Sequence, residues 1–189
     1  MRRFCLVLVA AIALSAFMGL AQEATINGPY RVSKTVKVGG AGTFDTACAD
    51  TIERRLYIPR KNPGRIMVFN LDTLEPAGEI PDASANGVVV DVKSGHGFAS
   101  SKPVVMWDTN TLKTLKTIEV QGGPDAILFD PFNERVYIFS HVAPNATVIN
   151  AADGSVVGTI DLGECRSRLL LTAMAAFMSI SETAAMSLS

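Results

Sequence analysis

The stretch Asp130-Pro-Phe-Asn-Glu-Arg-Val-Tyr137-Ile138 places an aspartate seven positions before an aromatic residue that lies in an apolar run. Two earlier stretches share this spacing, Asp50-Thr-Ile-Glu-Arg-Arg-Leu-Tyr57-Ile58 and Asp91-Val-Lys-Ser-Gly-His-Gly-Phe98-Ala99. The aromatic residues therefore recur with a period of about forty residues, which is typical of repeat architectures. The chain is predicted to contain at least three copies of one structural unit.

A second marker follows each aromatic residue in constant register. It reads Val68-Phe69-Asn70, Met106-Trp107-Asp108 and Val148-Ile149-Asn150, an apolar run that ends in Asp or Asn before a turn. Ten positions further on, each copy reaches an isoleucine in another β-rich run; these are Ile80, Ile118 and Ile160. Two markers in one register indicate a true repeat.

Each copy consists of short alternating apolar runs separated by Gly, Pro, Asn and Asp, which predicts a small antiparallel sheet. One such sheet cannot bury both faces, whereas radial stacking of several sheets can. Helical repeats of similar length do not fit, because Val, Ile, Thr and turn residues dominate and no 3.6-residue stripe occurs. The expected fold is all-β, a partial β-propeller of about three four-stranded antiparallel blades. The blades are expected at residues 44–84, 85–123 and 124–163, with residues 30–38 as a closing strand.

Arg135-Val-Tyr137-Ile, Val148-Ile149-Asn150 and the run Asp153-Gly154 to Gly163 resemble the YVTN-type propeller repeat of exported bacterial proteins. The resemblance covers residues 30–163. It implies a seven-bladed ring in most members, whereas only three full copies are present here. The middle copy departs from the pattern, since Phe98-Ala-Ser-Ser replaces the Tyr-Val run, and Pro124-Asp125 stands where the family usually has Pro-x-Gly.

The N-terminus has the pattern of a secretion signal. Arg2-Arg3 precede an apolar stretch, and Gly19-Leu20-Ala21 offers small residues before polar Gln22. Residues 1–21 are therefore predicted to be a signal peptide and 22–29 a linker, with an uncleaved membrane anchor as the alternative. The expected location is periplasmic or secreted. In that setting Cys48 and Cys165 either pair or stay as free thiols, and their spacing alone does not decide.

Residues 164–189 lack the blade pattern. When the reading frame is moved back by one base, Leu169 to Ser179 can spell a run that ends in Tyr-Val, at the repeat spacing after Tyr137. We therefore expect the tail to be the frameshifted end of a truncated propeller. Three blades without neighbours would expose apolar sheet faces, which favours self-association.

No motif for catalysis, metal binding or cofactor binding is present. His96 and His141 are expected to be solvated turn or loop residues, and Gly39–Gly42 to be a turn, because no phosphate-loop Lys-Ser/Thr follows it. The net charge of −1 does not suggest a nucleic-acid partner. Trp107 is expected in the core. Three turn aspartates are expected to cap backbone N–H groups rather than act as acids or bases: Asp50, Asp91 and Asp130.

One constellation suggests a ligand site. Asp45, Asn86 and Asp125 each lie twelve positions before a blade aromatic, where the first strand of a blade begins. Because that strand lines the channel of a propeller, the three side chains are candidates for a polar ring at the channel mouth that binds a cation or polar ligand. The alternative is that they cap the turns between blades.

These observations favour a binding or interaction scaffold outside the cytoplasm, with no catalysis expected. Its partner would be an unknown protein or a small-molecule ligand. One alternative is a lactonase-like or other metal-assisted hydrolase, in which Asp45 and Asp125 begin a metal site. The other is a truncated product without function.

Overall fold

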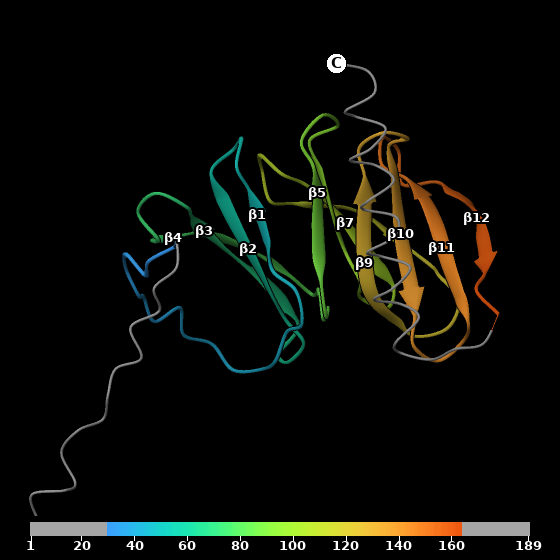
Figure 1. The fold of residues 1–189 in the computed structure, drawn as a ribbon, viewed down its shortest axis with the longest axis horizontal. Helices are drawn as coiled ribbons and strands as arrows, with labels where there is room; N and C mark the ends of the chain where they lie inside the picture. The colour runs from blue at the N-terminus through green and yellow to red at the C-terminus, as the bar shows by residue number, and fades with distance from the viewer. Residues whose placement is uncertain (1–29, 164–189) are drawn as a thin grey trace, which may run out of the picture. The chain divides into compact units, whose positions relative to one another are not determined.

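The protein is described by a computed structural model that covers residues 30–163 (Figure 1). The predicted signal peptide, linker and frameshifted tail lie outside the described residues, and so does Cys165. Within residues 30–163 all regular structure is β-strand, and no helix there is long and apolar enough to span a membrane.

Twelve strands in this part of the chain form three four-stranded antiparallel sheets, which we call the first, second and third blades. The first contains β1 (Cys48–Asp50), β2 (Arg55–Arg60), β3 (Arg65–Asn70) and β4 (Pro76–Pro81). The second contains β5 (Val88–Asp91), β6 (His96–Ala99), β7 (Val104–Asp108) and β8 (Thr114–Ile118). The third contains β9 (Pro124–Asp130), β10 (Arg135–Ser140), β11 (Asn145–Asn150) and β12 (Val156–Asp161). The strands of each blade follow one another in space in chain order, so the predicted fold class is confirmed.

The core lies in two layers between the blades. Successive residues of a strand point to opposite faces of a sheet, so one strand can serve both layers. In β7, Trp107 packs toward the first blade with Tyr57 and Ile80, whereas Met106 packs toward the third blade with Val136 and Ile118. The second blade is thus buried on both faces, and Trp107 is a core residue as expected.

The first strand of each blade lies nearest its counterparts. β5 contacts both β1 and β9, although these strands are far apart in the sequence. In Figure 1 the three blades stand side by side within residues 48–161. The outer place of each sheet is taken by β4, β8 and β12, which gives each blade an inner and an outer edge.

The three turn aspartates cap backbone groups as predicted. Asp50 Oδ1 accepts hydrogen bonds from the backbone N–H groups of Ile52 (2.9 Å) and Glu53 (3.0 Å). Asp91 and Asp130 each accept one from the residue two positions on, at 3.0 Å. Each turn then passes through a left-handed residue: Arg54, Gly95 and Glu134. The aspartate spacing therefore fixes the first hairpin of every blade.

The closing strand predicted at residues 30–38 does not form. A strand needs a neighbour for its backbone hydrogen bonds, and this segment pairs with none of the three described sheets. The last blade of a closed ring, where the segment was expected to pair, is not among the described residues.

The glycine-rich segment Gly39–Phe44 lies instead against the face of the first blade that points away from the second blade. Two of its carbonyl groups accept hydrogen bonds from the buried Arg60 guanidinium, Gly39 at 3.0 Å and Gly42 at 3.2 Å. The same guanidinium lies 5.3 Å from the ring centre of Phe44. A side chain on Gly42 would come within 2.0 Å of the carbonyl oxygen of Asn62, so the close contact requires glycine here.

Candidate functional site

The three residues predicted at a channel mouth come together in the structure. The carbonyl oxygen of Asn86 accepts hydrogen bonds from the backbone N–H groups of Asp45 (2.9 Å) and Thr46 (3.1 Å). The side-chain nitrogen of Asn86 donates to Oδ1 of Asp125 at 2.7 Å. Asn86 thus joins equivalent positions of all three blades, close to the start of their first strands.

The three side chains differ in exposure, and this divides their roles. Asn86 is only 8% exposed, Asp125 is half-buried and Asp45 is exposed. Asn86 is therefore a structural bridge, in keeping with the alternative that these positions cap the turns between blades. The carboxylates of Asp45 and Asp125 are the groups that a ligand can reach.

The backbone behind this cluster is closely packed. A methyl group on Gly87 would come within 2.3 Å of Thr46 Oγ1 and 3.1 Å of Ile127 Cγ2, which belong to the first and third blades. Gly87 also bonds to the buried Ser100 hydroxyl, through its N–H at 3.0 Å and its carbonyl at 3.2 Å. Sequence reasoning missed Gly87, although a glycine directly after a predicted site residue is a signal of close backbone approach.

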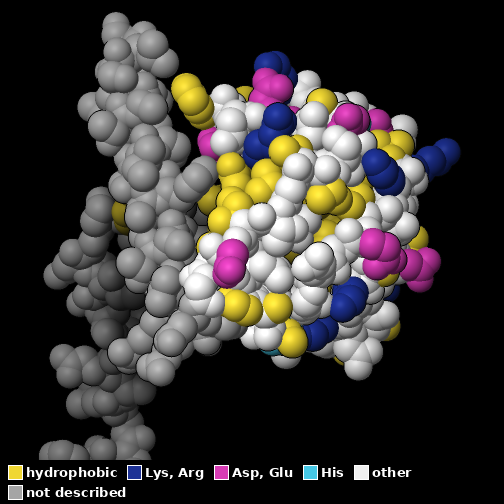
Figure 2. All heavy atoms as spheres, turned by 90° about the vertical axis from the view of Figure 1, so that its right-hand side faces the viewer, with side chains coloured by type: hydrophobic (Ala, Val, Ile, Leu, Met, Phe, Trp, Pro, Cys, Tyr) yellow, Lys and Arg dark blue, Asp and Glu magenta, His cyan; other side chains and the backbone are white. Residues whose placement is uncertain are grey.

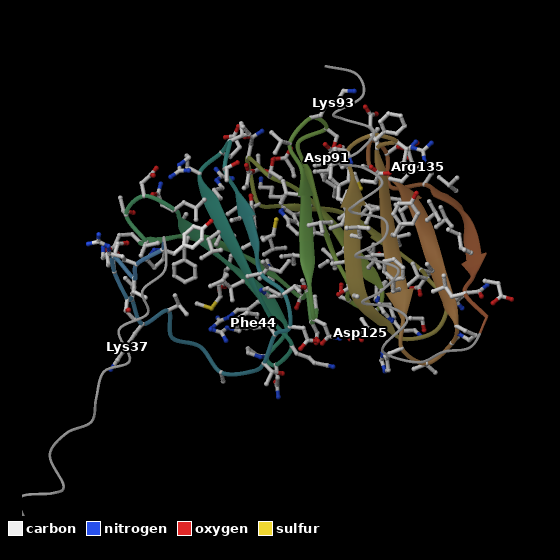
Figure 3. The ribbon with its side chains drawn as sticks, in the orientation of Figure 1. Lys37, Phe44, Asp91, Lys93, Asp125 and Arg135 are labelled. Atoms are coloured by element: carbon white, nitrogen blue, oxygen red, sulfur yellow. The ribbon has the colours of Figure 1, made fainter. Side chains whose placement is uncertain are left out.

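The cluster lies at the opposite end of the strands from the turn aspartates. Figure 3 shows Asp125 and Phe44 at one end, and Asp91, Lys93 and Arg135 at the other. Carboxylates in the turns at this other end are engaged locally: Thr111 holds the pKa of Asp108 below its usual range, and Ser155 does so for Asp153. Hydrogen bonds favour the ionised carboxylate, so these groups do not suit proton donation at neutral pH.

His96 is not the solvated turn residue that the sequence suggested. It opens β6 half-buried, and its Nδ1 lies 2.9 Å from the carbonyl oxygen of Ala151 in the third blade. His141 begins the loop after β10, where its backbone N–H donates to the carbonyl of Gly123 at 3.0 Å. Within residues 30–163 no three His, Cys, Asp or Glu side chains lie close enough to hold a metal ion.

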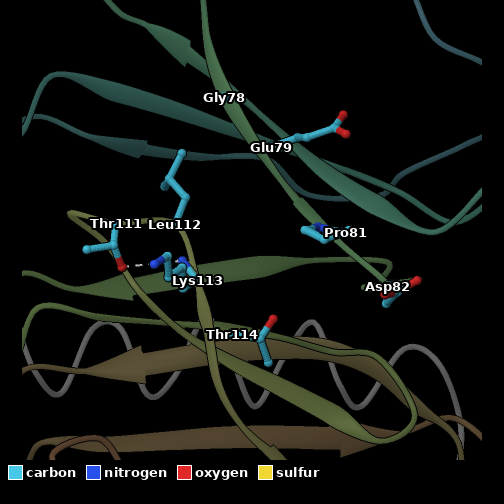
Figure 4. Close-up of a pocket in the computed structure, with 8 residues that line it drawn as sticks. All are labelled: Gly78, Glu79, Pro81, Asp82, Thr111, Leu112, Lys113 and Thr114. Atoms are coloured by element: carbon cyan, nitrogen blue, oxygen red, sulfur yellow. Dashed lines mark hydrogen bonds between the residues drawn. The ribbon is translucent and has the colours of Figure 1, made fainter.

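An open pocket that sequence reasoning did not foresee lies at the outer rim (Figure 4). It has a volume of ≈ 640 Å³ and lies between β4 of the first blade and the turn before β8 of the second. Leu112 extends over Gly78, while Glu79, Asp82 and Lys113 supply charge at its edge. The pocket marks the boundary between two blades.

Comparison with known proteins agrees with this architecture. No protein-family model matches the chain, and no curated protein matches its sequence. Among solved structures, the WD40 repeats of RRP9 match with a TM-score of 0.53 at 16% identity, over 65% of this chain and 39% of that one. U3-55K matches with a TM-score of 0.53 at 16% identity, over 65% and 40%. Hydrazine synthase of Kuenenia stuttgartiensis matches with 0.54 at 14% identity, over 60% and 35%.

The stacked blades and these likenesses together define the class. The chain has a β-propeller fold built from repeats, and it spans well under half the length of the solved chains that it matches. At this level of identity the likeness shows the fold alone.

Proposed function

We propose that the protein is an extracytoplasmic propeller-repeat scaffold that binds a positively charged or hydrogen-bond-donating partner at Asp45 and Asp125. The observation that carries the proposal is the Asn86 bridge, which holds one position of each blade together at one end of the inner strands. The likeness to WD40-repeat structures supports a scaffold, because propellers present loops at the ends of their blades for binding.

The chemistry of the cluster selects the kind of partner. A carboxylate accepts hydrogen bonds and attracts cations, and one oxygen of Asp125 is already held by Asn86. The exposed Asp45 carboxylate and the second oxygen of Asp125 then remain for a ligand. A lysine or arginine side chain of a partner protein, or a small polar molecule with donors, fits this arrangement.

The export part of the proposal rests on residues 1–21 and on the resemblance to the YVTN-type family. Expression of the whole chain in a bacterium, followed by the intact mass of the protein in the periplasmic fraction, tests it. The expected mass corresponds to a chain that begins at Gln22. A full-length chain found only in the membrane fraction would instead support the anchor.

The binding part is tested with immobilised protein and peptides of matched length that are lysine-rich, neutral or glutamate-rich. The lysine-rich peptide is expected to be retained, and Asp45→Asn combined with Asp125→Asn is expected to abolish retention. Glu53→Gln is the control, because Glu53 is an exposed carboxylate in the turn of Asp50, at the opposite end of the strands. Equal retention by both variants would contradict the proposal. Lactone hydrolysis with added divalent metal ions, assayed on the same protein, tests the hydrolase alternative separately.

A further inference from the structure

The outer face of the third blade is the face that points away from the second blade. It carries residues equivalent to those through which the first and second blades contact the blade that follows each of them. Ile80 in β4 is 0% exposed and Ile118 in β8 is 4% exposed, because the following blade covers them. Ile160, the equivalent residue of β12, is 44% exposed. Figure 2 faces this side of the molecule and shows hydrophobic side chains gathered on it. This is a blade-binding face with no following blade among the described residues.

A hydrogen-bond donor recurs at each of the two boundaries between blades. Arg55 Nη1 donates to the carbonyl oxygen of Thr109 in the second blade, and Nδ1 of His96 lies 2.9 Å from that of Ala151 in the third. Donor and acceptor are equivalent in the two cases: the donor opens the second strand, and the acceptor directly follows the third strand of the next blade. Arg135 is the corresponding residue of the third blade, and it donates to the adjacent carbonyl of Glu134 at 3.2 Å.

Each boundary also pairs a glycine with a large side chain. A methyl group on Gly78 in β4 would come within 2.5 Å of Leu112 Cδ1 in the next blade. At the second boundary the order is reversed: Lys116 in β8 takes the place of Gly78, and Gly154 takes the place of Leu112. A methyl group on Gly154 would lie 3.4 Å from Lys116 Cδ, and closer to two other residues of the second blade, Met106 (2.7 Å) and Ile118 (3.2 Å). Gly158 occupies the same place in β12, and nothing lies within 4 Å of it.

The complement of this face is present in the first blade of the same chain. Leu74 is the equivalent of Leu112 and has the same left-handed backbone, with φ of 62° against 59°. Leu71 follows β3 as Thr109 follows β7, so its carbonyl oxygen is the equivalent acceptor for Arg135. The first blade thus offers both the leucine that fits over Gly158 and the acceptor that fits the arginine.

We propose that a second copy of the chain docks its first blade on the outer face of the third blade, with Leu74 over Gly158 and the carbonyl of Leu71 bonded to Arg135. Two identical contacts related by a two-fold axis would close a ring of six blades. This proposal is independent of the ligand site at Asp45 and Asp125.

The segment Gly39–Phe44 lies on the face of the first blade that would contact the third blade of the other copy. Its contacts fall on Arg60 and Asn62, at the opposite end of the strands from Leu74, and on Met67 in the middle of β3. The Leu74 contact can therefore form while the segment is in place. Full docking of the two sheets requires the segment to leave Arg60.

Sedimentation velocity of the whole chain over a dilution series tests the proposal. The expected result is a concentration-dependent dimer. Gly158→Leu is expected to weaken dimerisation at least about tenfold, because it fills the space that Leu74 needs. Adding Leu74→Gly to this variant should restore the dimer, since the Lys116 and Gly154 pair shows that the reversed arrangement fits. Thr159→Leu, an exposed neighbour on the same strand, is the control and should leave the dimer unchanged.

Arg135→Ala provides a second measurement should Gly158→Leu fail to fold by circular dichroism. It is expected to weaken the dimer up to about tenfold through the lost hydrogen bond. A monomer at every concentration would overturn the proposal. A dimer that neither Gly158→Leu nor Arg135→Ala weakens would overturn it as well, because the contact would then lie on another surface.

Discussion

Asn86 donates a 2.7 Å hydrogen bond to Asp125 across the boundary between the second and third blades. The two residues hold the same position in successive repeats, Asn86 just ahead of β5 and Asp125 at the start of β9. The backbone carbonyl of Asn86 also accepts a hydrogen bond from the backbone N–H of Asp45. The side chain and the backbone carbonyl of this one residue therefore hold three blades in register at this end. The candidate ligand site is therefore also a stabilising element of the stack.

Asn86→Ala is expected to destabilise the protein by about 1–3 kcal/mol, because it leaves the half-buried Asp125 carboxylate without its donor. Urea unfolding followed by tryptophan fluorescence measures the change, since Trp107 lies in the core between the first two blades. Asp45→Ala serves as the control: its side chain is exposed, so its effect should stay within about 0.5 kcal/mol. Equal losses in the two variants would contradict the bridging role of Asn86.

Gly97→Ala is expected to be among the more damaging small substitutions. The added methyl group would come within 2.2 Å of the Trp107 ring, which is fully buried and cannot move aside without disturbing the layer shared with Tyr57. Overpacking of this kind costs about 1–3 kcal/mol. Gly158→Ala is the matched control in another strand, and should be nearly neutral in thermal unfolding at low protein concentration because no atom lies within 4 Å. A neutral Gly97→Ala would show that the ring is not held in place.

Arg60→Ala is expected to release the segment Gly39–Phe44 from the first blade. The buried guanidinium bonds two carbonyl groups of the segment and stacks on Phe44, and alanine replaces none of these contacts. Limited proteolysis should then cut the segment faster, with the new cleavage sites located by mass spectrometry. Lys61→Ala, an exposed neighbour, should leave the cleavage rate unchanged. Unaltered cleavage in Arg60→Ala would mean that other contacts hold the segment.

Cys48 is expected to react slowly with iodoacetamide in the folded protein. Burial raises the pKa of its thiol above the ordinary value of 9.0, so little reactive thiolate forms near pH 8. Peptide mass spectrometry after timed alkylation should show at least about tenfold faster modification in urea than in buffer. Equal rates would show that the thiol is not protected by the fold.

The same pKa shift predicts how stability depends on pH. A raised pKa in the folded state means that the unfolded chain loses this proton first. The contribution of Cys48 is therefore complete below its unfolded pKa and is lost as the pH rises through the folded value. Unfolding free energy should fall above about pH 9, and Cys48→Ala should reduce that fall.

Several features could be read from the sequence because they are local. The aspartate seven positions before each aromatic caps its own turn, and Asn70 accepts the N–H groups of Asp72 and Thr73 in the next turn, each at 2.9 Å. These interactions span two or three residues, so the local amino-acid sequence is enough to predict them. The equivalent positions of Asp45, Asn86 and Asp125 could likewise be counted, and the structure brings them together.

Other features could not be read from the sequence because they depend on the stacking of sheets. Whether Asn86 is a ligand group or a bridge was decided by its burial. The role of His96 was decided by the carbonyl of Ala151, which lies in another blade. Residues 30–38 alternate as a strand should, yet they pair with none of the three described sheets. Alternation shows that a segment can form a strand, but not whether a neighbouring strand is available to pair with it.

The sequence by itself determined the repeat, the strands of each blade and the turns that join them, because alternation and turn capping act over a few residues. Only the tertiary structure decided how one blade holds the next. The contacts of Leu112 with Gly78 and of Arg55 with Thr109 join residues from different repeats, and each has meaning only after the sheets have stacked. The physical reason is that packing depends on the shapes and hydrogen-bond donors of two surfaces, whereas the sequence of one strand describes only one of them.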